Sequence, residues 1–367
     1  MQLAHKIRLK PNKSQAEYFG RASGVARFTY NWALAEWKRQ YEVGEKPSAF
    51  SLKKQFNGIK REQFPFVMEV HRDCTSQPFT NVGKAFANFF RRLKQGEAQV
   101  GYPRFKSKKR TKPSFYIAND KLTLSDKRIR IPRIGWVKMA EALRFDGKIM
   151  GATVSRDGNH WFVSIIVDVG ELATFDNGQP AVGIDLGLKR LMTLSDGMVA
   201  ENQRHTLKHE ARLRKLNKKL SRQVNGSNNW WKTVYKLRQL HTQIRNGRQD
   251  WLHKWTSYIA KNYGVIGLEN LNAKGMMQNH RLAKHLADVA FGEIARQLDY
   301  KQHLYGSCLQ LIDRWVPSSQ LCAACGHRQS MPLSERIYDC PNCGSVRDRD
   351  ENAAINIEQE ALRLAYG

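Results

Sequence analysis

Three acidic residues stand at positions where a carboxylate is unusual. Asp185 follows an apolar run in GIDLG, Glu269 ends another in VIGLEN, and Asp350 lies in RDRDENAAIN at the start of a predicted final helix. A carboxylate at the end of a buried strand loses hydration unless a cation neutralises it. Two Mg²⁺ ions about 4 Å apart, bound through oxygen ligands, do this in sites that cleave phosphodiesters. From their positions alone, structural ion pairs explain the three acids equally well.

Four cysteines form two C-x-x-C pairs near the end of the chain. Cys322 and Cys325 are separated by 14 residues from Cys340 and Cys343, and a glycine follows each pair. Each pair can bind one side of a tetrahedral ion, and thiolates at this spacing favour Zn²⁺. Four sulfur ligands leave no open coordination position. We therefore expect one Zn²⁺ ion with a structural role.

The charge balance points to a polyanionic partner. Among 367 residues, 61 are Lys or Arg and 33 are Asp or Glu, so the net charge is +28. An excess of this size most often indicates nucleic acid. Hydrophobic residues make up 41%, which excludes a mostly disordered chain. No apolar run reaches the roughly 18 residues of a membrane span, and the first residues lack the apolar core of a signal peptide, so we expect a cytoplasmic protein with no membrane partner.

The first half of the chain combines helical and β patterns. Residues 2–9 alternate and predict a strand, whereas 14–42 and 51–95 have helical periodicity. Residues 114–169 carry short β-like stretches separated by turn signals. We therefore predict a helical block inserted into a β domain, in which the strand at 2–9 pairs with strands of 114–169.

The second half of the chain follows a predicted linker at 176–180. Strands are predicted within 181–194, at 264–268 and at 308–315. Helices are predicted at 202–222, 228–262, 282–304 and 351–364. Strands and helices in this order indicate an α/β sheet. Such a sheet would hold the three acids near its strand ends.

Two basic segments are candidates for contact with nucleic acid. The first, which contains no acid, includes Arg104, Lys106, Lys108, Lys109 and Arg110. A flexible basic loop is the alternative for this segment. The second is the predicted helix within 202–222, which has a leucine stripe and only one acid, Glu210. Its candidate residues are Lys208, Arg212, Lys215, Lys219 and Arg222. Because a solvated helix usually mixes both signs of charge, we favour nucleic-acid contact here.

Several segments, in order along nearly the whole chain, resemble the TnpB proteins of insertion sequences. These are also called OrfB-type transposases and are related to compact type V CRISPR effectors. GIDLG, GLENL and DRDENAAIN, with the two C-x-x-C pairs before the last, resemble the family's split RuvC-type nuclease domain. Three further segments resemble other parts of the family. They are GVARFTYNWALAEW (24–37), GYPRFKSKKR (101–110) and SSQLCAACG (318–326).

The resemblance implies an RNA-guided DNA endonuclease of a prokaryotic mobile element, associated with the nucleoid when bound to DNA. Its guide would be an RNA from the transposon's own end (ωRNA), and its target double-stranded DNA beside a short adjacent motif. The family's catalytic triad corresponds to Asp185, Glu269 and Asp350, which would bind the two Mg²⁺ ions. Asp350 is favoured over Asp348, which we expect to cap the last helix or bind an arginine. Readout of the adjacent motif is assigned to Ser76, Gln77 and Asn81.

The resemblance also implies an α/β multidomain architecture. A β-barrel-like wedge domain (1–10 and 111–175) would contain an inserted helical recognition domain (11–110). A RuvC-like nuclease domain of the RNase H fold (176–320 and 346–367) would contain a zinc ribbon (321–345). Two alternatives remain, a nuclease-silent RNA-guided DNA-binding protein and a transposase or transposase-accessory protein. The intact acidic positions favour the nuclease.

Overall fold

A computed structural model describes residues 1–171, 178–332 and 334–367 of the chain. The chain divides into two compact units, Met1–Glu171 and Leu172–Gly367. The predicted domain boundary at 175/176 and the start of the predicted linker at 176–180 lie outside the described residues. Within the described part of the chain, no helix is long and apolar enough to cross a membrane.

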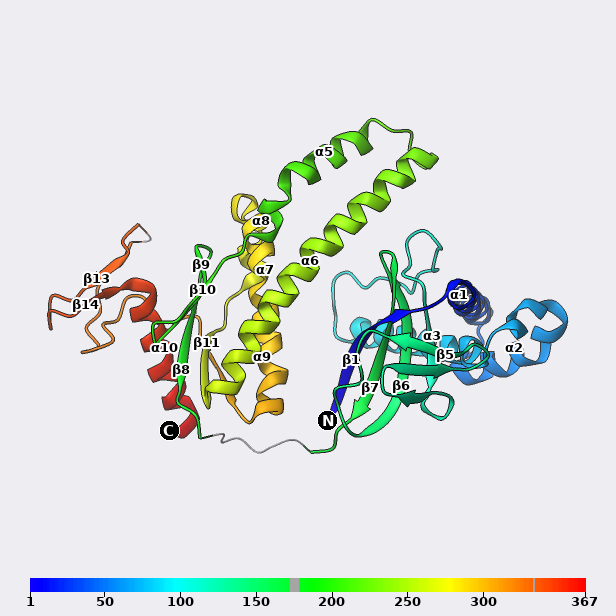
Figure 1. Cartoon of the computed structure of the whole chain (residues 1–367), viewed down its shortest axis with the longest axis horizontal. Coiled ribbons are helices and arrows are strands. Elements are labelled where there is room, and N and C mark those ends of the chain that lie inside the picture. The colour runs from blue at the N-terminus through cyan, green and yellow to red at the C-terminus, as the bar shows by residue number, and fades with distance from the viewer. Residues whose placement is uncertain (172–177, 333) are drawn as a thin grey trace. The chain divides into compact units, whose positions relative to one another are not determined.

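A seven-stranded antiparallel sheet forms one layer of the first unit (Figure 1). Its order is β2-β6-β7-β1-β5-β4-β3, with β2 and β3 at the edges. The strands are β1 (Gln2–Lys10), β2 (Ser114–Ala118), β3 (Thr123–Ser125), β4 (Arg128–Ile131), β5 (Gly135–Met139), β6 (Lys148–Asp157) and β7 (His160–Asp168). β1 pairs with β7 along its length and with β5 at its end. This pairing confirms that the N-terminal strand joins strands of 114–169.

Three α-helices lie between β1 and β2 in the sequence; the first and third contact β2, and the second packs on the other two. They are α1 (Lys13–Glu42), α2 (Ala49–Gln63) and α3 (Asp73–Lys94). The helical region predicted at 51–95 is therefore two helices. α2 ends shortly before Pro65, where a proline disfavours helical backbone, and a short 3₁₀ helix (Pro65–Glu69) follows. Phe19 of α1 and Phe79 of α3 are buried in the same core as Ile7 of β1.

A five-stranded sheet with the order β10-β9-β8-β11-β12 forms the centre of the second unit. Its strands are β8 (Val182–Leu186), β9 (Arg190–Leu194), β10 (Val199–Glu201), β11 (Val265–Glu269) and β12 (Cys308–Ile312). β8, β11 and β12 run parallel, whereas β9 and β10 are antiparallel to their neighbours. The strand predicted at 308–315 ends at Ile312.

Helices cover both faces of this second sheet (Figure 1). α6 (Asn228–Asn262) and α9 (Phe291–Tyr305) pack on one face, and α10 (Arg349–Tyr366) packs on the other. The helix predicted at 282–304 is two helices, α8 (His280–Val289) and α9, because Ala290 adopts left-handed backbone. The one predicted at 202–222 is also two, α4 (His205–Lys208) and α5 (Glu210–Ser221). A short helix, α7 (Ala273–Met276), precedes α8.

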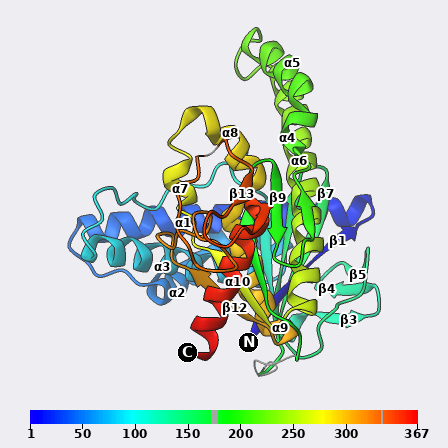
Figure 2. The ribbon, with the colours of Figure 1, turned by 90° about the vertical axis from the view of Figure 1, so that its left-hand side faces the viewer.

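Two features extend from this second sheet. α5 and the adjoining part of α6 form a hairpin that projects from it (Figures 1 and 2). The four cysteines lie in a small module between β12 and α10, built around the strands β13 (Ile337–Asp339) and β14 (Val346–Asp348). The module leads directly into the N-terminus of α10.

Candidate active site

The register of β8 and β11 brings two of the predicted acids together. Gly267 of β11 pairs with Gly183 of β8, and the next pair is Leu268 with Ile184. One further step along both strands places Glu269 beside Asp185. Since side chains alternate between faces and Ile184 and Leu268 belong to the core on the α6 face, both carboxylates project toward α10.

Two glycines allow α10 to lie directly on this face. A Cβ atom on Gly183 would lie 1.9 Å from the Ala354 carbonyl oxygen, and one on Gly267 would lie 2.7 Å from that of Ile357. Any side chain at either strand position would therefore overlap the helix backbone. Each glycine precedes a carboxylate by two residues, so it shares that carboxylate's face of the sheet. The absence of side chains brings the helix close to the sheet where the acids project.

The third acid, Asp350, lies at the N-terminus of α10. Asp348 caps the helix, since its Oδ1 accepts hydrogen bonds from the backbone N–H groups of Asp350 (2.9 Å) and Glu351 (3.3 Å). Its Oδ2 lies 3.3 Å from Arg190 Nη1. Both roles expected of Asp348 are thus confirmed. Asp350 stands in the first helical turn, with its Oδ1 3.7 Å from Arg336 Nη1 of the cysteine module.

The charges of Glu269 and Asp350 act on Asp185. Burial, followed by repulsion from Glu269 and then Asp350, raises the pKa of Asp185 to about 8. Arg349 opposes this shift without cancelling it. A buried carboxyl surrounded by other acids in this way favours binding of a cation. Among the described residues, only the four cysteines form a group of three or more His, Cys, Asp or Glu whose ligand atoms all lie within 4.8 Å of one another. The three carboxylates are therefore spread more widely than the cysteine sulfurs.

A serine that sequence reasoning missed completes the surroundings of Glu269. Ser318 Oγ donates a hydrogen bond to Glu269 Oε1 at 2.7 Å. Ser318 lies in the segment that joins β12 to the cysteine module, and its side chain is buried. The available signal is the Ser-Ser-Gln sequence shortly before Cys322, which carries the family resemblance but does not by itself indicate a contact with Glu269.

The four cysteines form a cluster that fits a tetrahedral ion. The Sγ atoms of Cys322 and Cys343 are 3.6 Å apart, as are those of Cys325 and Cys340. A Zn–S bond of about 2.3 Å gives a tetrahedron whose sulfurs are about 3.8 Å apart. The cluster is therefore consistent with one structural Zn²⁺ ion, as the spacing predicted.

The basic residues predicted on α5 lie in an exposed row on the hairpin. Lys208 precedes α5, Arg212, Lys215 and Lys219 lie on it, and Arg222 follows it; all five are exposed. The leucine stripe, Leu213, Leu216 and Leu220, is half-buried on a helix that packs against α6. The helix thus turns its apolar side to its neighbour and its cations to solvent.

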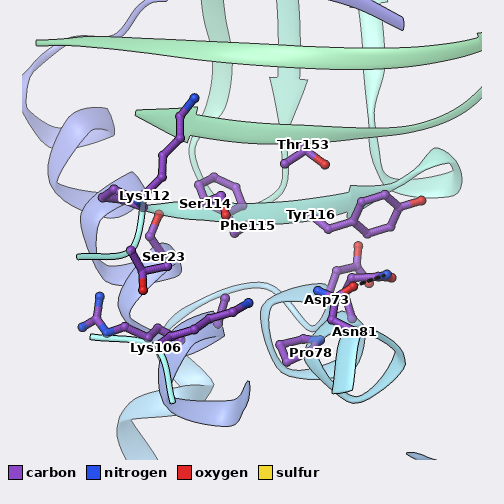
Figure 3. Close-up of a pocket in the computed structure, with 15 residues that line it drawn as sticks. Ser23, Asp73, Pro78, Asn81, Lys106, Lys112, Ser114, Phe115, Tyr116 and Thr153 are labelled. Carbon is purple, nitrogen blue, oxygen red and sulfur yellow. Dashed lines mark hydrogen bonds between the residues drawn. The ribbon is translucent and has the colours of Figure 1, made fainter. Parts of the chain in front are cut away.

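Two of the three predicted motif-reading residues and Lys106 of the predicted basic segment line one cavity of the first unit. The cavity, of about 140 Å³, lies between α1, α3 and the sheet, and its lining includes Gln77, Asn81 and Lys106 (Figure 3). Gln77 Nε2 donates to Asn81 Oδ1 at 3.4 Å. Ser76 is not among the lining residues, because one residue along a helix turns the side chain by about 100°.

Lys106 is held in place by α1. Asn31 bonds both backbone groups of Lys106, at 2.8 Å and 2.9 Å, and Lys106 Nζ lies 3.8 Å from the Tyr30 ring centre. Burial lowers the pKa of Lys106. Arg104, Lys108, Lys109 and Arg110 of the same segment are exposed. The segment is therefore ordered at Lys106 and presents its other cations to solvent.

Carboxylates converging on an α/β sheet, a four-thiolate cluster and exposed rows of Lys and Arg are features of metal-dependent enzymes that act on nucleic acids. Comparison with known families agrees. A family described as "Probable transposase" (OrfB_IS605) matches residues 164–280. A "Helix-turn-helix domain" of the same group matches residues 1–46, and a "Cas12f1-like, TNB domain" matches residues 291–357.

Full-length relatives give the family. The chain is 33% identical to a "Putative RNA-guided DNA endonuclease" of Streptomyces pristinaespiralis over 96% of this chain and 88% of that protein. It is 30% identical to the Escherichia coli K12 protein InsQ, which has the same description, over 96% and 91% of the two chains. The chain therefore belongs to the TnpB/OrfB family of RNA-guided DNA endonucleases.

A solved structure shares the fold. The Cas12f1 chain in a complex with single-guide RNA and target DNA superposes with a TM-score of 0.62 over 95% of this chain and 83% of that one. Sequence identity is 15%, so this likeness concerns the fold alone. The architecture is thus a mixed α/β multidomain fold similar to that of Cas12f1, with a four-cysteine cluster.

Proposed function

We propose that this protein cleaves double-stranded DNA at sites selected by a bound guide RNA, with Asp185, Glu269 and Asp350 as its catalytic carboxylates. The observation that carries the proposal is the convergence of the three acids. The paired ends of β8 and β11 supply two, and a helix seated on two strand glycines supplies the third. An ion pair does not account for Asp185, because acids are its main charged neighbours.

These carboxylates would hold two Mg²⁺ ions. Oxygen ligands suit Mg²⁺, and the mutual repulsion of the acids is relieved when cations bind between them. The ions would supply activation of a water molecule and stabilisation of the leaving 3′ oxygen. The chain's own contribution is to hold the acids close together before DNA arrives. A single nuclease site implies that the two DNA strands are cut in turn.

The basic surfaces would bind the RNA and the guide–target duplex. The exposed row on α5 and the cations at 104–110 are suited to phosphates, because Lys and Arg release counterions from nucleic acid when they bind it. The guide would be an ωRNA made from the end of the transposon that carries the gene. Base pairing with this RNA would select the DNA target.

The cavity of the first unit would read the adjacent motif. Gln77 and Asn81 carry amide groups that can donate to and accept from base edges. Arg27 and Lys106 in the same lining can hold the flanking phosphates. Ser76, which lies outside this lining, is a weaker candidate for the readout than the two amides.

The domain roles follow from the same proposal. Residues 1–10 and 111–175 would form the wedge domain and residues 11–110 the recognition domain. Residues 176–320 and 346–367 would form the RuvC-like nuclease domain, and residues 321–345 the zinc ribbon. The seven-stranded sheet with helices inserted between β1 and β2 supports the first pair of assignments. The cysteine module between β12 and α10 supports the second.

The test is cleavage by the purified protein–RNA complex. The protein is expressed with the DNA that flanks its gene, the co-purified RNA is sequenced, and a plasmid bearing the matching target is incubated with Mg²⁺. Asp185→Ala should abolish cleavage of both strands and leave RNA binding intact. Glu201→Gln, an exposed acid at the end of β10, is the matched control and should cleave normally.

Other outcomes would select another function. Cleavage of either strand by Asp185→Ala would refute the single-site nuclease. Guided DNA binding by the wild-type complex without cleavage would indicate the nuclease-silent alternative. Strand transfer of labelled transposon ends would indicate a transposase. Heterogeneous co-purified RNA would contradict the proposal that the protein binds one specific guide RNA.

A further inference from the structure

We propose that Ser318 is a positioning residue that fixes the orientation of the Glu269 carboxylate for metal binding. The proposal rests on the function proposed above for Glu269. The hydrogen bond from Ser318 Oγ to Glu269 Oε1 is 2.7 Å long, and Ser318 is 6% exposed. A hydroxyl that donates to a carboxylate at this distance makes one of the stronger kinds of hydrogen bond.

Hydrogen bonds to its own N–H and carbonyl groups hold the backbone of Ser318 in place. Before it, β12 ends at Ile312, whose carbonyl accepts from Asn270 N at 2.9 Å. The chain then turns, so that Ser318 N donates to the Val316 carbonyl at 2.8 Å. After it, Asn356 Nδ2 of α10 donates to the Ser318 carbonyl at 2.7 Å. Ser318 is thus tied to the sheet and to α10.

Glu269 needs such a partner because of its neighbours. Its side chain is half-buried at the last position of β11, beside Asp185, and the two carboxylates repel each other. Without a donor, the Glu269 side chain can rotate toward water and away from the other acids. The Ser318 hydroxyl occupies one acceptor position of Oε1 and leaves the others open. A carboxylate held this way keeps its orientation in the absence of metal.

The same segment connects this contact to the cysteine cluster. Asn356 Nδ2 also donates to the Leu321 carbonyl at 2.8 Å, one residue before Cys322. Asn352 donates to that carbonyl at 2.6 Å and accepts from Ala323 N at 2.9 Å. The two asparagines of α10 therefore link the position of Ser318 to that of the cysteine module.

The experiment compares Ser318→Ala, Ser318→Thr and Ser319→Ala in the protein–RNA complex. Ser319 is the neighbouring half-buried serine, and no hydrogen bond joins it to a carboxylate of the described residues. Removing a group that orients a metal ligand typically costs about 10–100-fold in metal affinity or activity. Ser318→Ala should raise the Mg²⁺ concentration for half-maximal cleavage by this factor. Ser318→Thr retains the hydroxyl and should need about the same Mg²⁺ concentration as the wild type. Ser319→Ala should also match the wild type.

A second readout does not depend on cleavage. Mg²⁺ bound to the folded complex raises its melting temperature according to the metal affinity. The Mg²⁺-dependent part of this rise should shift to higher concentration in Ser318→Ala, while the melting temperature without Mg²⁺ stays close to that of the wild type. A Glu269→Gln complex provides the background from Mg²⁺ bound by RNA.

Three results would overturn the proposal. Wild-type Mg²⁺ dependence in Ser318→Ala, with Glu269→Gln inactive, would show that the hydroxyl does not position the carboxylate. A drop in melting temperature with no change in Mg²⁺ dependence would give Ser318 only a packing role. Normal cleavage by Glu269→Gln would instead refute the function proposed for Glu269, and the proposal for Ser318 with it.

Discussion

Replacing Gly183 with alanine should force α10 away from the sheet. The new Cβ would lie 1.9 Å from the Ala354 carbonyl oxygen and 2.4 Å from the Glu358 nitrogen. Both are backbone atoms, so no side-chain rotation relieves the overlap. To reach an ordinary contact of 3.4 Å, the strand and the helix must separate by about 1.5 Å. The single methyl group therefore changes the position of a whole helix.

Stability and activity should both fall. Inserting a methyl group into a packed core costs about 1–3 kcal/mol, and we expect the upper end because backbone must move. For a unit of this size, that corresponds to a drop of about 6–12 °C in melting temperature. Asp350 is carried by the first turn of α10, and a misplacement of about 1 Å can reduce a reaction rate about 100-fold. Cleavage should thus fall even where the variant is folded.

The assay is calorimetric melting of the protein–RNA complex, together with target cleavage below the melting transition. Gly292→Ala is the matched control. Gly292 lies in α9, and a methyl group there would have no neighbouring atom within 4 Å, so alanine should be neutral or stabilise by up to about 1 kcal/mol. If Gly183→Ala melts within about 2 °C of the wild type and cleaves at the same rate, α10 does not lie against β8 as described.

Four further outcomes follow from the geometry. Cys322→Ser should remove bound zinc and lower the melting temperature, and unchanged zinc content by atomic absorption would contradict this. In magnesium-free buffer, wild-type stability should fall as pH rises toward about 8, because the raised pKa of Asp185 makes the folded state bind the proton more tightly than the unfolded state; Asp185→Asn should lose this slope. Lys215→Glu should weaken RNA binding in filter-binding assays and make this binding less dependent on salt concentration; unchanged binding would mean that α5 does not contact RNA. Asn81→Leu should change the preferred adjacent motif in a randomised-target library without changing cleavage of a pre-opened target, and an unchanged motif would exclude this residue from readout.

The sequence predicts well which acids lie near strand ends and which cysteines cluster, because both follow from local pattern and spacing. Asp185 and Glu269 end apolar runs, and the structure places both at strand ends in one register. The spacing of Cys322 to Cys343 predicts the cluster, because short C-x-x-C loops constrain four sulfurs locally. The role of Asp348 as the cap of α10 also follows from local preference.

Features that depend on tertiary contacts cannot be predicted from local sequence patterns. The contact between Ser318 and Glu269 joins residues that are 49 positions apart and depends on the turn after β12. The break at Ala290 requires left-handed backbone at a residue that favours helix. Lys106 and Gln77 line the same cavity. Lys106 is held there by hydrogen bonds with Asn31, which lies 75 positions earlier in the sequence.

The element that unites the site is α10. Its first turn carries Asp350, its backbone lies on Gly183 and Gly267, and its asparagines hold the segment that contains Ser318. Changes at the sheet and at Ser318 therefore act through one helix, and their effects should not be additive. If Gly183→Ala already displaces α10, adding Ser318→Ala should cost less than it does in the wild type. Equal costs in both backgrounds would mean that the helix and the serine position the acids independently.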